Sequence, residues 1–220
     1  MTKRTTRSES LTHGIVAMLR KHSTSTLSEV MGKRGYMNHE IKPITPDIKL
    51  AGPATTVFCH VGDNLTLHKA IEIAAPGDVL VVEAGGYKEG GGMWGEIMSF
   101  AAKTRGIEGL VMDGAIRDVK AIRDMAFKVF ARAVSPGGTV KATMGRINEP
   151  VVCAGLRVCP GDIIVGDDDG VVAVPAELVN EVLQMAERRA KEERKIKRLV
   201  LQGKTTMEIY GFDKATKSGN

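Results

Sequence analysis

A Pro-Gly-Asp turn followed by a long apolar run occurs twice in the sequence, and this pattern restricts the fold more than any other. It opens "PGDVLVVEAGG" at residues 76–86 and "PGDIIVGDDDGVVAVP" at residues 160–175. Pro-Gly pairs form tight turns, and short apolar runs without a helical period are typical of strands buried on both faces. We therefore predict a buried strand after each turn. The "DDDG" at 167–170 lacks the Glu-terminated loop of a calcium site and is predicted to be a hairpin turn.

Helical and strand patterns alternate along the rest of the chain. Helical spacing covers residues 11–20, 26–32, 64–74 and 95–106, and a further helix begins near Asp118. Strand patterns cover residues 54–60, 109–114, 128–134 and 149–158. This alternation predicts an α/β fold. A helical repeat then runs from 176 to 202, so we expect a core at 1–175 and a C-terminal helix with its tail at 176–220.

Charge and composition argue against nucleic acid and membrane partners. The segment "ERRAKEERKIKR" at 187–198 holds seven Lys or Arg against three Glu, and so carries four of the five net positive charges. A basic stripe on one helix is typical of a solvated face, and one Trp, three Tyr and five Phe leave few rings to stack on bases. No run approaches the roughly 20 apolar residues of a membrane helix.

The cysteines and the start of the chain indicate the compartment. Cys59, Cys153 and Cys159 are an odd number in apolar surroundings, which favours small buried thiols over a disulfide framework. The basic start leads only into the short "GIVAMLRK" and not into the core of a signal peptide. We predict a cytoplasmic protein.

The loop "AGGYKEGGGMWGEIM" at residues 84–98 contains five glycines between Gly85 and Gly92. Glycine lets the backbone turn sharply and approach a ligand closely. The loop enters a helix whose first amides, which have no helical partner, can hold a carboxylate or a phosphate; these are the amides of Gly95, Glu96, Ile97 and Met98. A loop that is merely mobile, with Glu96 favoured by the helix dipole alone, is the competing interpretation. No P-loop or "GxGxxG" pattern is present in the sequence.

Arg117 and Asp118 lie side by side in "GAIRDV", where an apolar strand gives way to a helix. Asp118 could cap that helix while Arg117 lies on the surface, or both side chains could point into a site at the strand's end. In a strand-helix-strand unit the loops after both strands open on the same edge of the sheet. Glu96, Arg117 and Asp118 can therefore converge there.

These motifs resemble a known family. "WGE", then twenty residues, then "RD" is similar to the metal-dependent pyruvate aldolases related to the ribonuclease E regulator RraA. The likeness extends over most of the chain, through "GDNLTLHKAIE", "PGDVLVV", "GLVMDGAIRDV", "GTVKATMGRINEPVVCAGLRVCPGD", "GDDDGVVAVP" and "GKTTMEIYG". The resemblance implies a swivelling β/β/α fold, here with a long C-terminal helix.

It also implies roles for single residues. Asp118 would bind Mg²⁺ or Mn²⁺ directly, Arg117 would contact the pyruvyl part of the substrate, and the amides of 95–98 would hold its carboxylate. One direct carboxylate agrees with the preference of Mg²⁺ for keeping several waters. This chain departs from many relatives at Glu96, where they have Asp, and at Ala121, where they often have an acid.

The terminal helix carries an apolar stripe that leads to a carboxylate. The stripe consists of Val179, Val182, Leu183, Ala186 and Ala190, and the next position at helical spacing is Glu193. Glu193 is either a snorkelling residue or a group buried against a partner. The resemblance implies the latter: an acid from a neighbouring subunit would reach the site and position a proton-accepting water. A homotrimer or dimer of trimers, with active sites between subunits, would follow.

The implied activity is that of a class II lyase on 2-oxo acids. It would cleave 4-hydroxy-4-methyl-2-oxoglutarate or 4-carboxy-4-hydroxy-2-oxoadipate to pyruvate, and decarboxylate oxaloacetate through the same pyruvate enolate. The alternative is a non-enzymatic regulator that binds ribonuclease E or another protein, but such members are shorter and lack the terminal helix. A methyltransferase is disfavoured because no glycine-rich S-adenosylmethionine loop is present in the sequence. Asp63 and Asn64 are predicted to cap a helix, with a possible substrate contact.

Overall fold

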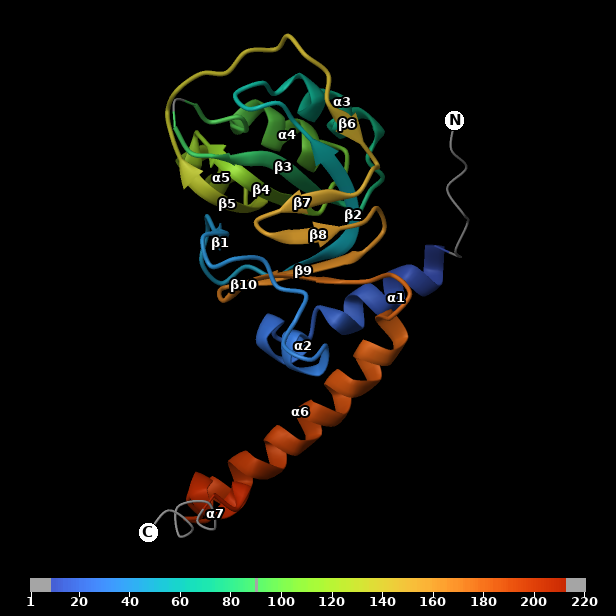
Figure 1. Cartoon of the computed structure of the whole chain (residues 1–220), viewed down its shortest axis with the longest axis vertical. Coiled ribbons are helices and arrows are strands. Elements are labelled where there is room, and N and C mark those ends of the chain that lie inside the picture. Colours follow the sequence, from blue (N-terminus) through green and yellow to red (C-terminus); the bar gives the residue numbers. More distant parts are fainter. Residues whose placement is uncertain (1–8, 90, 213–220) are drawn as a thin grey trace.

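The computed structural model describes residues 9–89 and 91–212. The chain forms seven helices and ten strands over these residues (Figure 1). The helices are α1 (Glu9–Leu19), α2 (Thr24–Val30), α3 (Leu65–Ile73), α4 (Glu96–Thr104), α5 (Val119–Asp124), α6 (Val179–Leu201) and α7 (Thr206–Tyr210). The strands are β1 (Lys42–Pro43), β2 (Leu50–Phe58), β3 (Val79–Tyr87), β4 (Gly109–Ile116), β5 (Lys128–Val134), β6 (Arg146–Ile147), β7 (Val151–Cys153), β8 (Leu156–Val158), β9 (Ile163–Asp167) and β10 (Gly170–Val174).

The central sheet has the strand order β1-β5-β4-β3-β2-β9-β10, with β6 added to β2. Strands β2, β3, β4 and β5 pair in parallel, and the helices α3, α4 and α5 connect them in turn. Strands β9 and β10 form an antiparallel hairpin across the Asp-rich turn, and β9 pairs antiparallel with the first half of β2. The two ends of the sheet approach each other, since the Lys42 amino group of β1 donates to the Asp169 carbonyl at 2.6 Å. The α/β prediction and the hairpin at 167–170 are confirmed.

The parallel strands are mainly apolar because they lie between two cores. Along β3, Leu80 and Val82 pack with α3, α4 and α5, whereas Val79 and Val81 pack with the hairpins β7–β8 and β9–β10. Each Pro-Gly turn is closed by its aspartate: Asp78 accepts from the Ala75 amide at 3.0 Å, and Asp162 accepts from the Cys159 amide at 2.8 Å. A strand buried on both faces reads as a continuous hydrophobic run.

Several strand boundaries differ from the prediction, and two of the differences follow directly from strand pairing. β3 continues through Gly85 and Gly86 to Tyr87, so its end takes in part of the segment expected to be a loop. Both glycines have positive φ, 66° and 70°, and the pairing of β3 with β4 shifts register there. This shift is a β-bulge, which depends on the pairing of the two strands and cannot be recognised from the sequence of β3 alone. β2 begins at Leu50 instead of Ala54, because its first residues pair with β9 and not with β3. The glycine loop proper covers residues 88–95.

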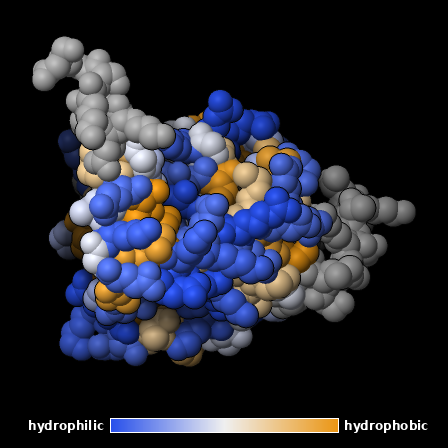
Figure 2. Space-filling model, turned by 90° about the horizontal axis from the view of Figure 1, so that it is seen from below, coloured by the Kyte–Doolittle hydropathy of each residue, from blue (hydrophilic) through white to orange (hydrophobic). Residues whose placement is uncertain are grey.

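Helix α6 packs on the body only through its first turns. Four residues of the predicted apolar stripe, Val179, Val182, Leu183 and Ala186, are buried against β9, β10 and the N-terminal helices, and Ala190 is half-buried. Beyond them the helix projects away from the body and ends beside α7 (Figure 1). Seen from this end, the surface is mainly hydrophilic with separate apolar patches (Figure 2). None of the helices in the described part of the chain is long and apolar enough to cross a membrane.

The anchoring of α6 predicts a matched pair of substitutions. Leu183 is 7% exposed and Leu178, just before the helix, is 41% exposed. We expect Leu183→Ala to lower the free energy of unfolding by about 2–3 kcal/mol and Leu178→Ala by less than about 1 kcal/mol. Urea unfolding at one fixed protein concentration measures both, and equal losses would contradict the observed anchor.

Candidate functional site

The glycine loop and the end of β4 meet at one edge of the sheet. The Met93 amide donates to the Ala115 carbonyl at 2.8 Å, and the Arg117 amide donates to the Trp94 carbonyl at 2.8 Å. Trp94 and Ile116 form an isolated parallel bridge. The loop after β3 therefore extends the sheet locally and delivers α4 directly beside Arg117 and Asp118.

The glycines of this loop allow close approach. A Cβ atom on Gly92 would lie 2.7 Å from the Ile116 carbonyl carbon and from the Ser135 oxygen. A Cβ on Gly95 would lie 2.4 Å from Asp118 Oδ2. Gly95 has an extended backbone, φ −152° and ψ −163°, which any residue adopts, so the missing side chain is what the position requires. The loop is thus built against the strand end.

Asp118 does not cap its own helix. It occupies the N-cap position of α5 in the left-handed conformation, φ 59° and ψ 37°, and its side chain makes no capping hydrogen bond. Its Oδ2 instead accepts from the Glu96 amide of α4 at 3.0 Å and lies 3.6 Å from Arg117 Nε. Non-glycine residues adopt this conformation at a cost and do so often at functional sites. The capping interpretation of Asp118 is wrong, and the two side chains converge on the start of α4.

The remaining predicted residues of α4 divide between solvent and interior. Glu96 and Ile97 are exposed, Ile97 to 77%, whereas Gly95 and Met98 are buried. The Met98 sulfur lies 3.7 Å from Asn64 Nδ2 of the neighbouring loop. The structure brings together Gly95, Glu96, Arg117 and Asp118, and the Glu96 amide at the start of α4 donates to Asp118.

The comparisons with known proteins bear on this edge. A family model described as RraA-like, Aldolase/RraA, matches residues 24–173. The chain belongs to the RraA-like family. It is 34% identical over 195 residues, 89% of this chain and 92% of the relative, to a protein of Halalkalibacterium halodurans named "Putative 4-hydroxy-4-methyl-2-oxoglutarate aldolase".

Solved structures of RraA-like proteins share the fold. An uncharacterized protein from Pseudomonas syringae pv. tomato superposes with a TM-score of 0.80 at 27% identity, covering 88% of this chain and 91% of that one. Streptomyces coelicolor RraAS2, described as an unusual member of the RNase ES inhibitor RraA protein family, gives 0.76 at 27% identity, covering 84% and 96%. The predicted RraA-like fold with a long C-terminal helix is confirmed.

Glu193 lies far from this edge within one RraA-like chain. It belongs to α6, which projects from the body on the side away from α4 and α5 (Figure 1). Its side chain is 39% exposed and pairs with Arg189 Nε at 3.2 Å. The chain therefore does not bring Glu193 to its own Arg117 and Asp118.

The donor set at the edge fits a hard divalent cation. The Asp118 side chain is 42% exposed, and Oδ2 carries the contacts to Glu96 and Arg117. Within residues 9–89 and 91–212 no three His, Cys, Asp or Glu side chains are grouped as metal ligands. One accessible carboxylate beside a chelating substrate matches Mg²⁺ or Mn²⁺, which keep several waters, better than zinc, which takes several protein ligands.

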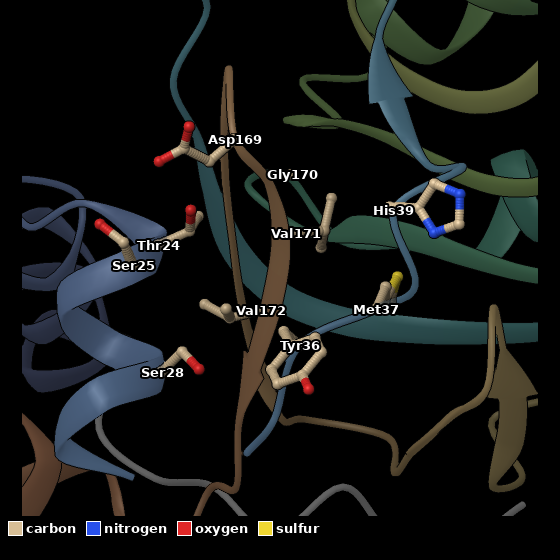
Figure 3. Close-up of a pocket in the computed structure, with 10 residues that line it drawn as sticks. All are labelled: Thr24, Ser25, Ser28, Tyr36, Met37, His39, Asp169, Gly170, Val171 and Val172. Atoms are coloured by element: carbon tan, nitrogen blue, oxygen red, sulfur yellow. The ribbon is translucent and has the colours of Figure 1, made fainter. Parts of the chain in front are cut away.

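A hollow of about 280 Å³ lies away from this edge, between α2, β10 and the segment at 36–39 (Figure 3). Thr24, Tyr36, His39 and Asp169 are among its lining residues, and none of the predicted site residues lines it. None of the three thiols is among the residues that meet at this edge. Cys59, Cys153 and Cys159 are free, and burial raises the pKa of Cys59 to about 12 and that of Cys153 further. Neutral buried thiols are poor nucleophiles.

Asp63 and Asn64 lie just before α3 and form hydrogen bonds to other segments of the chain, including the glycine loop. Asp63 accepts from the Leu65 amide at 3.0 Å, as a helix start requires, and also from the amides of Ala142 and Thr143 at 2.9 and 2.7 Å. Asn64 makes no capping bond and instead donates to the Met93 carbonyl of the glycine loop at 2.9 Å. Sequence spacing could suggest the first contact only, because the others join segments far apart in the chain.

Because backbone amides donate to Asp63, we expect its contribution to the stability of the fold to depend on pH. The hydrogen bond from Leu65, followed by those from Ala142 and Thr143, lowers the pKa of Asp63 below its ordinary 3.8. A lowered pKa means that the charged form stabilises the fold, so this contribution is complete above pH 3.8 and is lost as the pH falls through the lower folded value. We expect Asp63→Asn to lower Tm at pH 7 and the difference from wild type to shrink towards pH 3.

The matched control is Asp124→Asn, since Asp124 is exposed and pairs with Lys120 in the neighbouring turn, at 2.6 Å. It should leave Tm nearly unchanged at either pH. A Tm difference for Asp63→Asn that stays constant from pH 7 to pH 3 would contradict the assignment.

Proposed function

We propose that this RraA-like protein is a divalent-metal-dependent lyase that cleaves 4-hydroxy-2-oxo acids to pyruvate. Its substrates would be of the type of 4-hydroxy-4-methyl-2-oxoglutarate or 4-carboxy-4-hydroxy-2-oxoadipate. The observation that carries the proposal is the convergence of a carboxylate, a guanidinium and the first amides of α4 at one sheet edge. The name of the Halalkalibacterium halodurans relative supports the same reaction class.

The start of α4 and Arg117 would bind the 2-oxo acid. The first amides of a helix lack helical acceptors and favour anions. Because the Glu96 amide already donates to Asp118, those of Gly95, Ile97 and Met98 remain for the substrate carboxylate. The Arg117 side chain is 44% exposed and lies beside Asp118, where its fixed donors can reach the 2-oxo group. A guanidinium stays charged throughout and presents planar donors, which a lysine does not.

Asp118 would hold Mg²⁺ or Mn²⁺, and the cation would polarise the 2-oxo group and stabilise negative charge on its oxygen. In retro-aldol cleavage the C4 hydroxyl loses its proton and the C3–C4 electron pair passes into pyruvate enolate. Arg117 stabilises the enolate oxygen, and protonation at C3 completes pyruvate. Oxaloacetate gives the same enolate by losing CO₂ and needs no proton acceptor, so its decarboxylation would be a second activity.

A neighbouring subunit would supply the group that positions the proton-accepting water. We assign this role to Glu193 of a second copy, because α6 carries it away from the body of its own chain. The half of α6 beyond Ala186, with α7, would then pack on that neighbour in a homotrimer or hexamer. The active sites would lie between subunits.

Removal of the Asp118 carboxylate tests the lyase directly. With Mg²⁺ or Mn²⁺ present, we expect wild type to release pyruvate from 4-hydroxy-4-methyl-2-oxoglutarate and from oxaloacetate. Asp118→Ala should lower both rates by at least about a hundredfold, since it removes the only direct protein ligand proposed for the cation. A coupled assay for pyruvate, with and without EDTA, measures both.

The control is Asp124→Asn, which removes an exposed carboxylate six residues further along the chain and should keep full activity. Full turnover in EDTA would contradict the metal. If wild type turns over neither substrate, the lyase is wrong for these compounds, and a regulator that binds ribonuclease E or another protein becomes the better reading.

Mixing of subunits tests the origin of Glu193. In the cleavage of 4-hydroxy-4-methyl-2-oxoglutarate, Asp118→Ala and Glu193→Ala should each be inactive alone, whereas refolded equal mixtures should regain about a quarter of wild-type activity. In a closed ring of randomly mixed subunits, about one site in four combines an intact Asp118 with an intact Glu193 from the neighbour. A mixture of Asp118→Ala with Asp118→Asn is the negative control, and full activity of Glu193→Ala alone would contradict the shared site.

A further inference from the structure

A buried hydrogen-bond chain runs from the sole tryptophan to the Asp118 carboxylate. The Trp94 indole N–H donates to Ser99 Oγ at 2.6 Å, and the Ser99 hydroxyl donates to the Gly95 carbonyl at 3.0 Å. That carbonyl and the Glu96 N–H belong to one peptide group, and this N–H donates to Asp118 Oδ2 at 3.0 Å. Trp94 and Ser99 are both 0% exposed.

The direction of every bond in this chain is fixed. An indole nitrogen can only donate, so Ser99 Oγ must accept from it and is left with its own hydrogen to give to Gly95. A trans peptide places its N–H opposite its C=O, so an acceptor role at Gly95 goes with a donor role at Glu96. Bonds in such a chain polarise one another, and they do so most where water is excluded.

The tryptophan is itself held firmly. Its ring stacks on Phe127 at 6.1 Å between centroids and 12° between planes, and its carbonyl accepts from the Arg117 amide at 2.8 Å. Trp94 is therefore anchored to β4 through its backbone and to α4 through its side chain. A shift of α4 relative to Arg117 would have to break one of these contacts.

The orientation of the Asp118 carboxylate depends on this hydrogen-bond chain. It has a left-handed backbone, makes no cap bond to α5, and is 42% exposed. Among the described residues, the backbone donor recorded for its carboxylate is the Glu96 amide. The carbonyl of the same peptide group accepts twice from Ser99, from the backbone N–H and from the hydroxyl, each at 3.0 Å, and the hydroxyl is the part of this hold that a side-chain substitution removes.

We propose that Ser99 and Trp94 are positioning residues that orient the Asp118 carboxylate for cation binding, through the Gly95–Glu96 peptide. The inference rests on the proposed function, because it takes Asp118 as the residue that holds the cation. Neither residue touches substrate or cation. Their effect is transmitted through one peptide group, so the two should act as one unit.

The test measures affinity for Mn²⁺ itself, from the electron paramagnetic resonance signal of the free ion, and needs no turnover. We expect Ser99→Ala to raise the Kd for Mn²⁺ about five- to tenfold, at or below the lower end of the roughly 10–100-fold effect of groups that bond a metal ligand directly, because Ser99 acts through one peptide group. Ser99→Cys should behave alike, because a thiol fills the space but is a weak hydrogen-bond partner. Trp94→Phe should raise Kd about two- to fivefold, and the double variant no more than Ser99→Ala alone.

The matched control is Thr55→Val. It removes another buried hydroxyl donor, the one that bonds Asp78 at 2.7 Å, in a Pro-Gly turn away from the site. It should lower Tm and leave the Kd for Mn²⁺ unchanged. A Kd raised as much by Thr55→Val as by Ser99→Ala would show general destabilisation and overturn the proposal.

The outcomes separate the two proposals. If wild type binds Mn²⁺ and Ser99→Ala binds it with the same Kd, the positioning role is overturned and the proposed lyase activity is unaffected. Failure of wild type to bind Mn²⁺ overturns both. If Ser99→Ala does not fold, Trp94→Phe decides by the same criterion, since it keeps an aromatic ring on this side chain and removes the indole N–H.

Discussion

The parallel pairing of β3 with β4 is the constraint on which the site depends. From Val79 opposite Gly109 to Glu83 opposite Asp113, the two strands run in step, so the chain leaves both at the same edge. Residues far apart in sequence, Glu96 and Asp118, are then brought within a hydrogen bond. The ladder is rigid because each strand is packed on both faces, by helices on one side and hairpins on the other.

A cluster of charged side chains lies near this edge, on the face of the sheet away from the helices. Arg132 of β5 pairs with Asp113 of β4 and with Glu40 from the segment before β1, and Asp113 also accepts from the Ala154 amide at 2.8 Å. Burial raises the pKa of Asp113, and the hydrogen bond from Ala154 opposes this. Buried charges need such complete pairing, and removal of one partner leaves the other unpaired. The cluster ties an N-terminal segment to the strands that deliver the site.

Local patterns predicted the elements well because hydrophobic period is a local property. The strand at 128–134 has the predicted bounds, and α6 lies within the predicted 176–202. The end of β3 was missed, because its bulge depends on pairing with β4 across some thirty residues of chain. The convergence of Arg117 and Asp118 followed from topology, but the side-chain partner of Asp118 did not: a cap and a tertiary acceptor use the same residue type. The Trp94–Ser99 bond spans five residues and has no sequence signature of its own.

The approach of β1 to β10 has a consequence for the behaviour of the sheet as a whole. β1 is only two residues long, includes Pro43, and is linked to the β9–β10 turn through Lys42. An exposed sheet edge offers unpaired amides and carbonyls to other chains, and short, proline-bearing edges suppress this. The near closure of the sheet therefore leaves little open edge for a foreign strand to join. Aggregation by strand addition to this sheet is therefore disfavoured by the topology itself.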